Sequence, residues 1–396
     1  MSQHQDPVVI VSAARTPMGG FMSDFADLAA HDLGGVAIKA AVERAGIAPA
    51  LVEEVLFGNC LMAGQGQAPA RQALFKGGLP QSTGAVTLSK MCGAGMEATI
   101  LAHDQLIAGS REVMVSGGME SMSGAPYLLK KGRGGYRMGH DKVFDHMMLD
   151  GLEDAYEPGR SMGTFGEDCA AKYQFTREQQ DAFAIASVTR AQEAARSGAF
   201  DAEIAPVTLK TRKGEVTVSV DEGPAKARLD KIASLKPAFR KDGTITAASS
   251  SSINDGAAAM VLMRESTAQR LGCKPLARIV GHATHAQAPE WFSTAPVGAT
   301  EKLLKKIGWQ VGDVDLWEIN EAFAVVPMAL MADLKIPHDK VNVNGGACAL
   351  GHPIGASGAR ILVTLVHALK ARGLQRGLAT LCIGGGEATA MAIELI

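Results

Sequence analysis

The chain contains two similar halves, and this internal repeat constrains its fold more than any other feature. Residues 113–122 (VMVSGGMESM) resemble residues 381–391 (LCIGGGEATAM), because each has an apolar run, a glycine cluster and a glutamate. The segment that ends at Asn59 (AVERAGIAPALVEEVLFGN) resembles the segment that ends at Asn320 (LLKKIGWQVGDVDLWEIN). The two pairs have similar offsets, about 267 and 261 positions, as expected for a duplicated supersecondary arrangement.

Each half alternates apolar strands with amphipathic helices. Runs such as VVIVSA, which starts near Val8, and EVMVSGG predict strands, whereas residues 33–45 and 300–307 have the apolar spacing of helices. Alternating β and α segments indicate an α/β architecture in which helices cover the sheets. The 396 residues are too many for a single hydrophobic core, so more than one domain is expected.

A stretch between the two halves has no counterpart and is richer in charge, as in KKGRGGYR and KTRKGE. It predicts an inserted domain with its own helix, which starts at a capping box from Thr176 to Gln179 and continues to about Arg196. Such an insertion can supply substrate contacts, although a solvated subdomain would have the same composition. The predicted domains are an N-terminal half of residues 1–122 and 243–271, an insertion of residues 123–242, and a C-terminal half of residues 272–396.

Charge and hydropathy argue against several classes of protein. The formal net charge is −2, so no overall basic surface for nucleic acid is expected. No run approaches about 20 uninterrupted apolar residues, so no membrane span is predicted. The six cysteines are scattered without a CxxC pair, which argues against a disulfide framework or a zinc site. A reducing, cytoplasmic location is predicted.

Cys92 is a candidate nucleophile. It precedes GAGMEATILAHDQL, whose small and apolar residues predict a buried helix. A thiol at a helix N-terminus is expected to ionise more easily, because unpaired backbone N–H groups and the helix dipole stabilise the thiolate. A small buried cysteine without a chemical role is the commoner alternative.

His352 lies in the glycine-rich run NGGACALGHPIGASG, between a predicted strand and a predicted helix. Glycines cost backbone entropy, and they are needed where φ is positive or where another group approaches the main chain. We expect a ligand or a reacting group to be the cause here. The alternatives are a tight structural turn around a core histidine, or a metal half-site with Cys348, which lacks a second ligand cluster.

Two further loops complete a possible site. Cys382 ends a strand and enters GGGE, where backbone N–H groups can stabilise an oxyanion. Asn320 lies where a strand ends and a helix begins, a position at which asparagine most often caps the helix. Together with Cys92 and His352, they supply a nucleophile, a base, a second thiol and an amide that can hold a water. These are the components of two-step acyl transfer through a thioester.

Several motifs resemble those of the thiolases in order and spacing, over essentially the whole chain: KMCGAGME, SINDGAAA, NEAFA, GGACALGHPIGASGAR and CIGGGEATA. The resemblance implies a thiolase fold, with two βαβαβαββ halves in a five-layered α-β-α-β-α core and an inserted loop domain that binds coenzyme A. It also implies a reversible Claisen condensation of two acetyl-CoA to acetoacetyl-CoA, with coenzyme A thioesters as substrates and no cofactor or metal.

The resemblance also implies a role for each catalytic residue. Cys92 would accept the acyl group, His352 would activate it, and Cys382 would exchange the α-proton of the second acetyl-CoA. Asn320 would hold a water that forms one oxyanion hole with His352. The backbone N–H groups of Cys92 and Gly384 would form the other. A thioester α-proton is poorly acidic, so its enolate needs preorganised donors as well as a base.

Coenzyme A contacts are also implied by the family pattern. Lys226 or Arg228 would meet the nucleotide phosphates. The residues that would bind the pantetheine or line its groove are Ser251, Ala247, Phe239, Leu152, Met162 and Phe323. For these residues, an ordinary polar turn or core packing is the alternative.

The chain departs from the short-chain pattern at Ser161, where a ligand-contacting histidine is usual, and at residues 249–252, where SSSS replaces NASG. A degradative 3-ketoacyl-CoA thiolase for longer chains is therefore one alternative. A non-catalytic acyl-CoA-binding protein is another, although the retained Cys92, His352 and Cys382 argue against it. The family further implies a homotetramer, with residues 127–147 joining two dimers, and a place in fatty acid metabolism.

Overall fold

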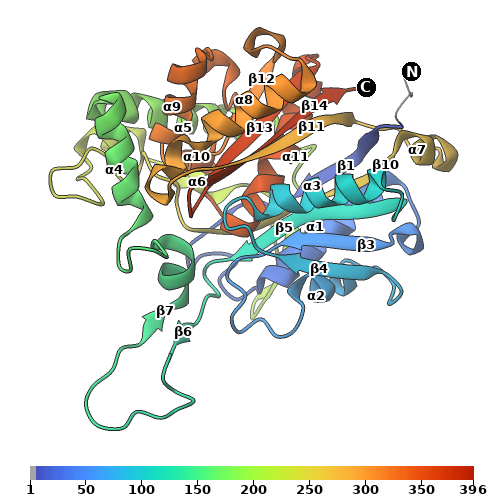
Figure 1. Ribbon diagram of the computed structural model, residues 1–396. Helices are drawn as coiled ribbons and strands as arrows, with labels where there is room; N and C mark the ends of the chain where they lie inside the picture. Colours follow the sequence, from blue (N-terminus) through green and yellow to red (C-terminus); the bar gives the residue numbers. More distant parts are fainter. Residues whose placement is uncertain (1–5) are drawn as a thin grey trace.

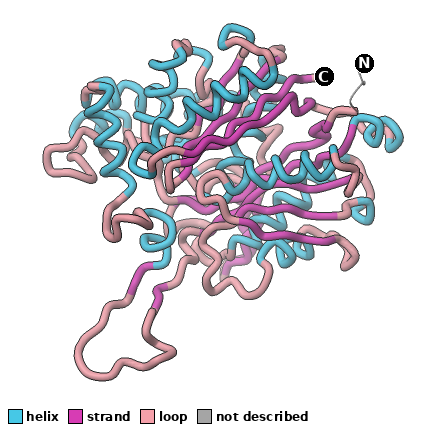
Figure 2. Tube along the Cα trace, in the orientation of Figure 1, coloured by secondary structure: helices cyan, strands magenta, loops and turns pink. Residues whose placement is uncertain are grey.

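Residues 6–396 are described in the computed structural model, so residues 1–5 of the predicted N-terminal half lie outside it. Two β-sheets are stacked with helices between and outside them (Figures 1 and 2). The strands follow the order β12-β13-β14-β11-β1-β10-β5-β3-β4, and β1 and β11 join the sheets through a short antiparallel contact. The first sheet contains β1 (Val8–Arg15), β3 (Glu54–Gly58), β4 (Gly84–Leu88), β5 (Val113–Ser121) and β10 (Asn254–Arg264), with β2 (Gly19–Gly20) beside β10. The second contains β11 (Ala277–Ala286), β12 (Leu316–Ile319), β13 (Arg376–Ile383) and β14 (Glu387–Leu395).

The two sheets have the same topology, which agrees with the predicted duplication. Outward from the centre, β10 and β5 are antiparallel neighbours and β3 is parallel to β5; β14, β13 and β12 repeat this pattern. The repeat ending at Asn59 and Asn320 therefore follows equivalent strands, β3 and β12. The other predicted pairing is misaligned, because Gly117 lies within β5 whereas Gly384 lies in the turn between β13 and β14. The equivalent of β4 is reduced to a single bridge between Trp317 and Val341.

The helices occupy three layers. Between the sheets lie α3 (Ala94–Ile107) and α11 (Ile354–Arg372), which share one apolar core with the inward faces of both sheets. The outer face of the first sheet is covered by α1 (Ala30–Ala45) and α2 (Pro69–Lys76), with α7 (Glu265–Leu271) at its edge. The outer face of the second is covered by α8 (Ala295–Ile307) and α9 (Val325–Leu334). The predicted α-β-α-β-α order is confirmed.

Apolar composition follows this layering along single elements. In β1, Val8 and Ile10 face the central layer, whereas Val9 and Val11 face α1, so the strand is apolar on both faces. The central helix α11 is long and apolar enough to cross a membrane, but 83% of its apolar window is buried inside the protein. Its position between two sheets accounts for its composition as that of a core helix.

The chain between β5 and β10 contains α4 (Met162–Tyr173), α5 (Arg177–Ser197), α6 (Glu222–Lys226) and the hairpins β6 (Tyr127–Leu128)–β7 (Phe144–Asp145) and β8 (Val207–Thr211)–β9 (Gly214–Val218). Helix α5 begins at the predicted capping box, with Thr176 as N-cap. The buried Arg15 of β1 donates to Glu203 at 2.5 Å and to both oxygens of Asp221 at 2.7 and 2.8 Å. This ion-pair network anchors the segment to the first sheet.

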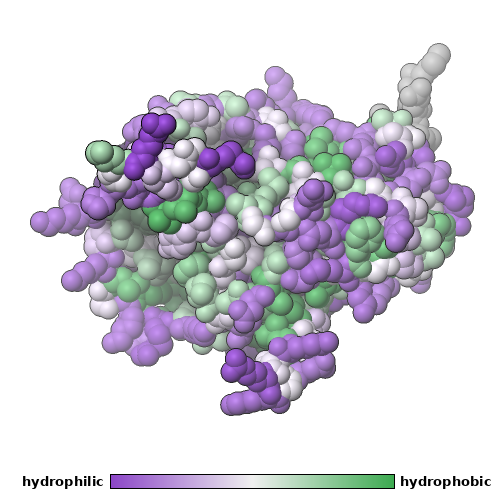
Figure 3. All heavy atoms as spheres, turned by 90° about the horizontal axis from the view of Figure 1, so that it is seen from below, coloured by the Kyte–Doolittle hydropathy of each residue, from purple (hydrophilic) through white to green (hydrophobic). Residues whose placement is uncertain are grey.

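The β6–β7 hairpin projects from the body of the molecule (Figure 1). Its loop is solvent-exposed, and the Met138 side chain is fully exposed at its tip. The hairpin projects from the face that Figure 3 shows, on which hydrophobic patches lie among hydrophilic side chains.

Candidate active site

Cys92 lies in the loop from β4 to α3, two residues before the helix begins. Gly93 is the N-cap, and a Cβ there would lie 2.3 Å from Cδ1 of Ile383 in β13. The missing side chain therefore lets the start of α3 contact the end of β13. Backbone N–H groups of Gly384 and of Cys92 itself reach the sulfur, and Cys382 lies close enough to interact electrostatically with it.

The prediction of an easily ionised Cys92 is wrong for this resting site. Burial raises the pKa of the thiol to about 11, although the backbone N–H groups of Gly384 and Cys92 act to lower it. The donors at the helix start are thus present, but removal of water outweighs them. Cys92 is a neutral thiol at neutral pH until something accepts its proton.

His352 lies between two helices rather than between a strand and a helix. The short helix α10 (Ala347–Leu350) precedes it, and α11 begins two residues after it. The strand prediction failed because the partner strand has shrunk to the Val341 bridge. The backbone N–H of His352 donates to the carbonyl of Ser252 at 3.2 Å, which fixes the loop against the segment before β10.

Protein groups, rather than a ligand, approach the main chain at Gly351 and Gly355 of this loop. Gly351 has φ of +95°, and a Cβ there would lie 1.9 Å from Oδ1 of Asn254. A Cβ on Gly355 would lie 2.7 Å from Oε2 of Glu120. The expectation of a ligand at these positions is therefore wrong: other segments of the chain press against the main chain and hold the histidine in place.

Hydrogen bonds assign the tautomer of His352. The hydroxyl of Ser357 donates to the carbonyl of Pro353 at 2.9 Å, so it accepts from Nδ1 of His352 at 2.5 Å. Nδ1 then carries the proton and Nε2 has a free lone pair. Burial, with a smaller contribution from the positive charge of Arg360, lowers the pKa of His352 to about 3. The imidazole is therefore neutral at neutral pH and can accept a proton at Nε2.

Asn320 lies beside this lone pair. Its Nδ2 is 3.4 Å from Nε2 of His352, while its backbone N–H donates to the carbonyl of Thr380 at 3.1 Å. The side chain does not cap a helix, because α9 begins five residues later with Ala324 as its N-cap. Its Oδ1 is buried, and none of the groups of residues 6–396 pairs with it. An amide oxygen left unpaired in this way can accept a hydrogen bond from a water.

Cys382 and Gly384 lie at the end of β13 and in the turn after it. Cys382 is fully buried in an apolar cluster with Phe165 and Phe323, and burial followed by the nearby Cys92 raises its pKa well above the ordinary value. Gly385 and Gly386 have φ of +92° and +90°. This left-handed turn directs the N–H of Gly384 toward the Cys92 sulfur.

A cavity of about 260 Å³ brings most of the predicted ligand-binding residues together. Ser161 also lines it, at the N-cap of α4, and Ala247 is exposed outside the lining. The cavity adjoins Gly384, because a Cβ there would lie 3.6 Å from Cε of Met162. The predicted residues in the lining are Leu152, Met162, Phe239, Ser251, Phe323 and His352.

The two basic residues predicted for the phosphates are exposed and paired with neighbours. Lys226 pairs with Glu222, and Arg228 pairs with Asp230 at 2.9 Å. Exposed pairs of this kind contribute little to stability and exchange partners at small cost. Both lysine and arginine are therefore available to an anion.

Sequence reasoning missed Glu120, which holds the catalytic loops together. Its buried carboxylate accepts hydrogen bonds from Asn59 Nδ2 at 2.6 Å and from the backbone N–H groups of Cys60, Leu61 and Gly355 at 2.9 to 3.1 Å. Burial raises its pKa to about 7 against these donors. The sequence did contain one signal: Glu120 is the single charged residue of the apolar strand VMVSGGMES. A carboxylate buried in such a strand needs hydrogen-bond partners, which indicates a structural role.

Two thiols, a neutral imidazole and an amide with an unpaired oxygen on a duplicated α/β core define a class of enzymes that transfer acyl groups through cysteine. Residues 8–266 match the thiolase N-terminal domain, and residues 273–395 match the thiolase C-terminal domain. The chain therefore belongs to the thiolase family.

Full-length relatives agree with this membership. The chain is 51% identical over 388 residues to an acetyl-CoA acetyltransferase of Rhizobium meliloti, with 98% of each chain covered. Its structure resembles a crystal structure of the Bacillus anthracis acetyl-CoA acetyltransferase, with a TM-score of 0.96, 42% identity, and 98% and 99% of the two chains covered. It also resembles an Ascaris suum thiolase in complex with coenzyme A, with a TM-score of 0.94, 42% identity, and 98% and 100% covered.

Proposed function

We propose that this thiolase condenses two acetyl-CoA molecules to acetoacetyl-CoA and coenzyme A, and catalyses the reverse cleavage, through an acetyl thioester on Cys92. The observation that carries the proposal is the unprotonated Nε2 of His352, which can accept a proton in the wall of the substrate cavity. The acetyltransferase name of the relative that is 51% identical supports the choice of substrate.

In the first half-reaction, Nε2 of His352 accepts the proton of the Cys92 thiol. The thiolate sulfur attacks the carbonyl carbon of acetyl-CoA, and the carbonyl oxygen becomes an oxyanion. Two N–H groups, those of Gly384 and Cys92, lie where they can stabilise that charge. The C–S bond to coenzyme A then breaks, and coenzyme A leaves with the proton of Cys382. The acetyl group remains on Cys92, Cys382 is left as a thiolate, and His352 keeps the former Cys92 proton on Nε2.

In the second half-reaction, the Cys382 thiolate removes a proton from the α-carbon of a second acetyl-CoA. The resulting enolate oxygen accepts hydrogen bonds from the protonated Nε2 of His352 and from a water held by Asn320. The α-carbon attacks the acetyl carbonyl on Cys92, and the C–S bond to Cys92 breaks. Acetoacetyl-CoA forms, and the Cys92 sulfur takes back the proton from His352. Since the pKa of Cys382 is raised by burial and by Cys92, its thiolate is a strong base once formed.

A short acyl group is part of the proposal. The cavity of about 260 Å³ lies at the small end for ligand sites, and its wall includes the bulky side chains of Phe239 and Phe323. Ser251, Phe239, Leu152, Met162 and Phe323 line the groove for the pantetheine arm. Lys226 or Arg228 meets the phosphates, and Ala247 lies at the rim.

Rates of thiolysis of acetoacetyl-CoA and of a series of longer 3-ketoacyl-CoA substrates test the proposal. We expect the highest kcat/KM with acetoacetyl-CoA, and the Cys92→Ser variant serves as the inactive control. A clear preference for the long substrates would instead support the degradative 3-ketoacyl-CoA thiolase. Binding of acyl-CoA without turnover would support a non-catalytic carrier.

We further propose a dimer of dimers joined by the projecting hairpin, without a cofactor, a nucleic-acid partner or a membrane, acting in the cytoplasm in fatty acid metabolism. The exposed loop between β6 and β7 supports the assembly, because it carries apolar side chains such as Met138 into solvent. Light scattering of the full chain and of a variant with a shortened loop tests the assembly. Conversion from tetramer to dimer is expected.

A further inference from the structure

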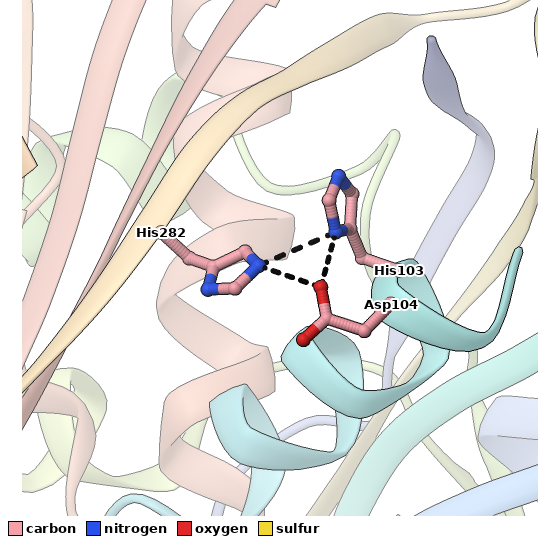
Figure 4. Close-up of side chains that lie close together, drawn as sticks. All are labelled: His103, Asp104 and His282. Carbon is pink, nitrogen blue, oxygen red and sulfur yellow. Dashed lines mark hydrogen bonds and ion pairs between the residues drawn. The ribbon is translucent and has the colours of Figure 1, made fainter. Parts of the chain in front are cut away.

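Two histidines and an aspartate meet far from the catalytic loops. His103 and Asp104 belong to the last turns of α3, and His282 belongs to β11 of the other half. Figure 4 shows one ring nitrogen of each histidine and one carboxylate oxygen pointing toward a common point. Asp104 Oδ1 is 2.9 Å from His103 Nδ1 and 3.0 Å from His282 Nε2, and the two nitrogens are 3.3 Å apart.

These spacings match the coordination shell of a transition-metal ion. Ligand atoms in a tetrahedral Zn²⁺ site with bonds of about 2.0 to 2.1 Å stand about 3.3 Å apart, close to all three edges here. An ion placed over this triangle would keep a fourth position free for water. Imidazole nitrogen and carboxylate oxygen are ligand types that Zn²⁺ accepts, whereas Mg²⁺ prefers oxygen alone.

Two basic side chains lie near the cluster. One opposing charge is near: Lys306 donates to the carbonyl of His282 at 3.1 Å. The nearby Arg278 is paired with Glu394.

The cluster is accessible to an ion from solution. The side chain of Asp104 is 56% exposed, and those of His103 and His282 are 16% and 13% exposed. Both histidines line a surface groove of about 500 Å³ with Trp309 and Lys306. The pair of histidines is thus held by the fold, while the carboxylate faces water and can adjust to an incoming cation.

We propose that His103, Asp104 and His282 form a binding site for a divalent transition-metal ion of the Zn²⁺ type, with three protein ligands and one water. The ion links α3 to β11 and so connects the two halves. His103 lies about 16 Å along the helix from Cys92, so the site strengthens the scaffold and does not take part in acyl transfer. The spacing of the cysteines could not reveal this site, because its ligands are two histidines and an aspartate that come from opposite halves of the chain.

Calorimetric titration of the full chain with Zn²⁺ alone, with Mg²⁺ as a parallel titrant, tests the proposal. We expect a Zn²⁺ site whose affinity falls by more than about tenfold in Asp104→Asn and in His282→Gln, and stays unchanged in His140→Gln. His140 is a matched control because it is exposed in the loop between β6 and β7. Zn²⁺ should raise the Tm of the native chain more than that of Asp104→Asn.

The thiols of the catalytic site also attract Zn²⁺, so the position of the ion must be observed. Crystals soaked in Zn²⁺ should show an anomalous peak between His103, Asp104 and His282. A peak confined to Cys92 and Cys382, or equal affinity in the native chain and the Asp104→Asn variant, would overturn the proposal. Since Asp104 is half-exposed, its variant keeps the test valid if His282→Gln fails to fold. Neither outcome depends on the substrate of the catalytic site.

Discussion

The loop before α3 and the loop before α11 occupy equivalent places in the two halves, yet one carries a thiol and the other an imidazole. The first follows a complete strand, β4, and places Cys92 directly before the N-cap of α3. The second follows a single bridge at Val341 and contains the short helix α10 before His352. Duplication therefore preserved the scaffold while the two loops diverged in local structure.

The inserted segment accounts for much of this difference. In the second loop, a Cβ on Gly345 would lie 2.5 Å from the carbonyl of Ser187 in α5, so the insertion presses directly on the loop. The hydroxyl of Ser187 also accepts from the N–H of Gly346 at 3.0 Å. The base is thus held in place by the insertion as well as by its own half of the molecule.

Removing either chemical group should have the largest effect. Cys92→Ser and His352→Ala should each lower kcat/KM for acetoacetyl-CoA thiolysis by at least about 10³-fold, because the thiol and its base act in one proton transfer. The double variant should be little worse than either single variant, for the same reason. Steady-state kinetics of the three variants measure this, and circular dichroism checks the fold. Additive losses would show that the two loops act independently.

The packing of the second loop can be tested by a pair of glycines. Gly351→Ala should lower the free energy of unfolding by more than about 3 kcal/mol, because φ of +95° and the contact with Asn254 both exclude a Cβ. Gly373→Ala, at φ of +64° with nothing within 4 Å, should cost about 1 kcal/mol. Urea unfolding compares them. Equal costs would mean that the loop is less tightly held than we describe.

The helix positions after the two loops offer a matched pair of hydroxyls. Ser357 in α11 donates to the carbonyl of Pro353 and accepts from His352, whereas Thr99 in α3 donates to the carbonyl of Gly95 without a histidine partner. Ser357→Ala should lower kcat by about 10 to 100-fold, because the ring loses the group that selects its tautomer.

Thr99→Ala is the control and should leave kcat nearly unchanged. Ser357→Ala should also alter the pH profile of kcat, which a purely structural change would not. Equal losses of activity in the two variants would show that Ser357 acts only through packing.

The last prediction concerns the ionisation of the nucleophile. Since burial raises the pKa of Cys92 to about 11, its thiolate fraction should rise about tenfold per pH unit from about pH 6 to pH 9. Alkylation by iodoacetamide, followed at the Cys92 peptide, measures this slope. The slope should persist in His352→Ala, because a histidine with a pKa of about 3 forms no resting ion pair. A rate that is already constant at pH 7 would contradict our account.

Much of the scaffold was predictable, because repeats and capping residues are local patterns. The duplicated halves and the start of α5 at Thr176 follow from them. The site was harder, because its properties depend on burial and on distant partners. Cys92 stands at the predicted helix start, but the sequence does not reveal how little water surrounds it. Asn320 was expected as a cap, whereas the chain runs on to Val325 before α9 begins.

The glycines around His352 illustrate the same limit. Their number predicted close approach to the main chain, but the approaching groups belong to Asn254 and Glu120, which are far away in the sequence. The role of Glu120 was missed for the same reason, since its donors come from separate segments. Long-range contacts of this kind are visible only when the chain is folded.

The central claim is that Cys92 carries the acetyl group while His352 serves as its base. Rapid quenching after mixing with acetyl-CoA, followed by peptide mass spectrometry, tests it most directly. We predict an acetyl group on the Cys92 peptide of the native chain, and very slow formation of that adduct in His352→Ala. Acetylation of Cys60 or Cys382 in place of Cys92, or an unchanged rate without His352, would contradict the account.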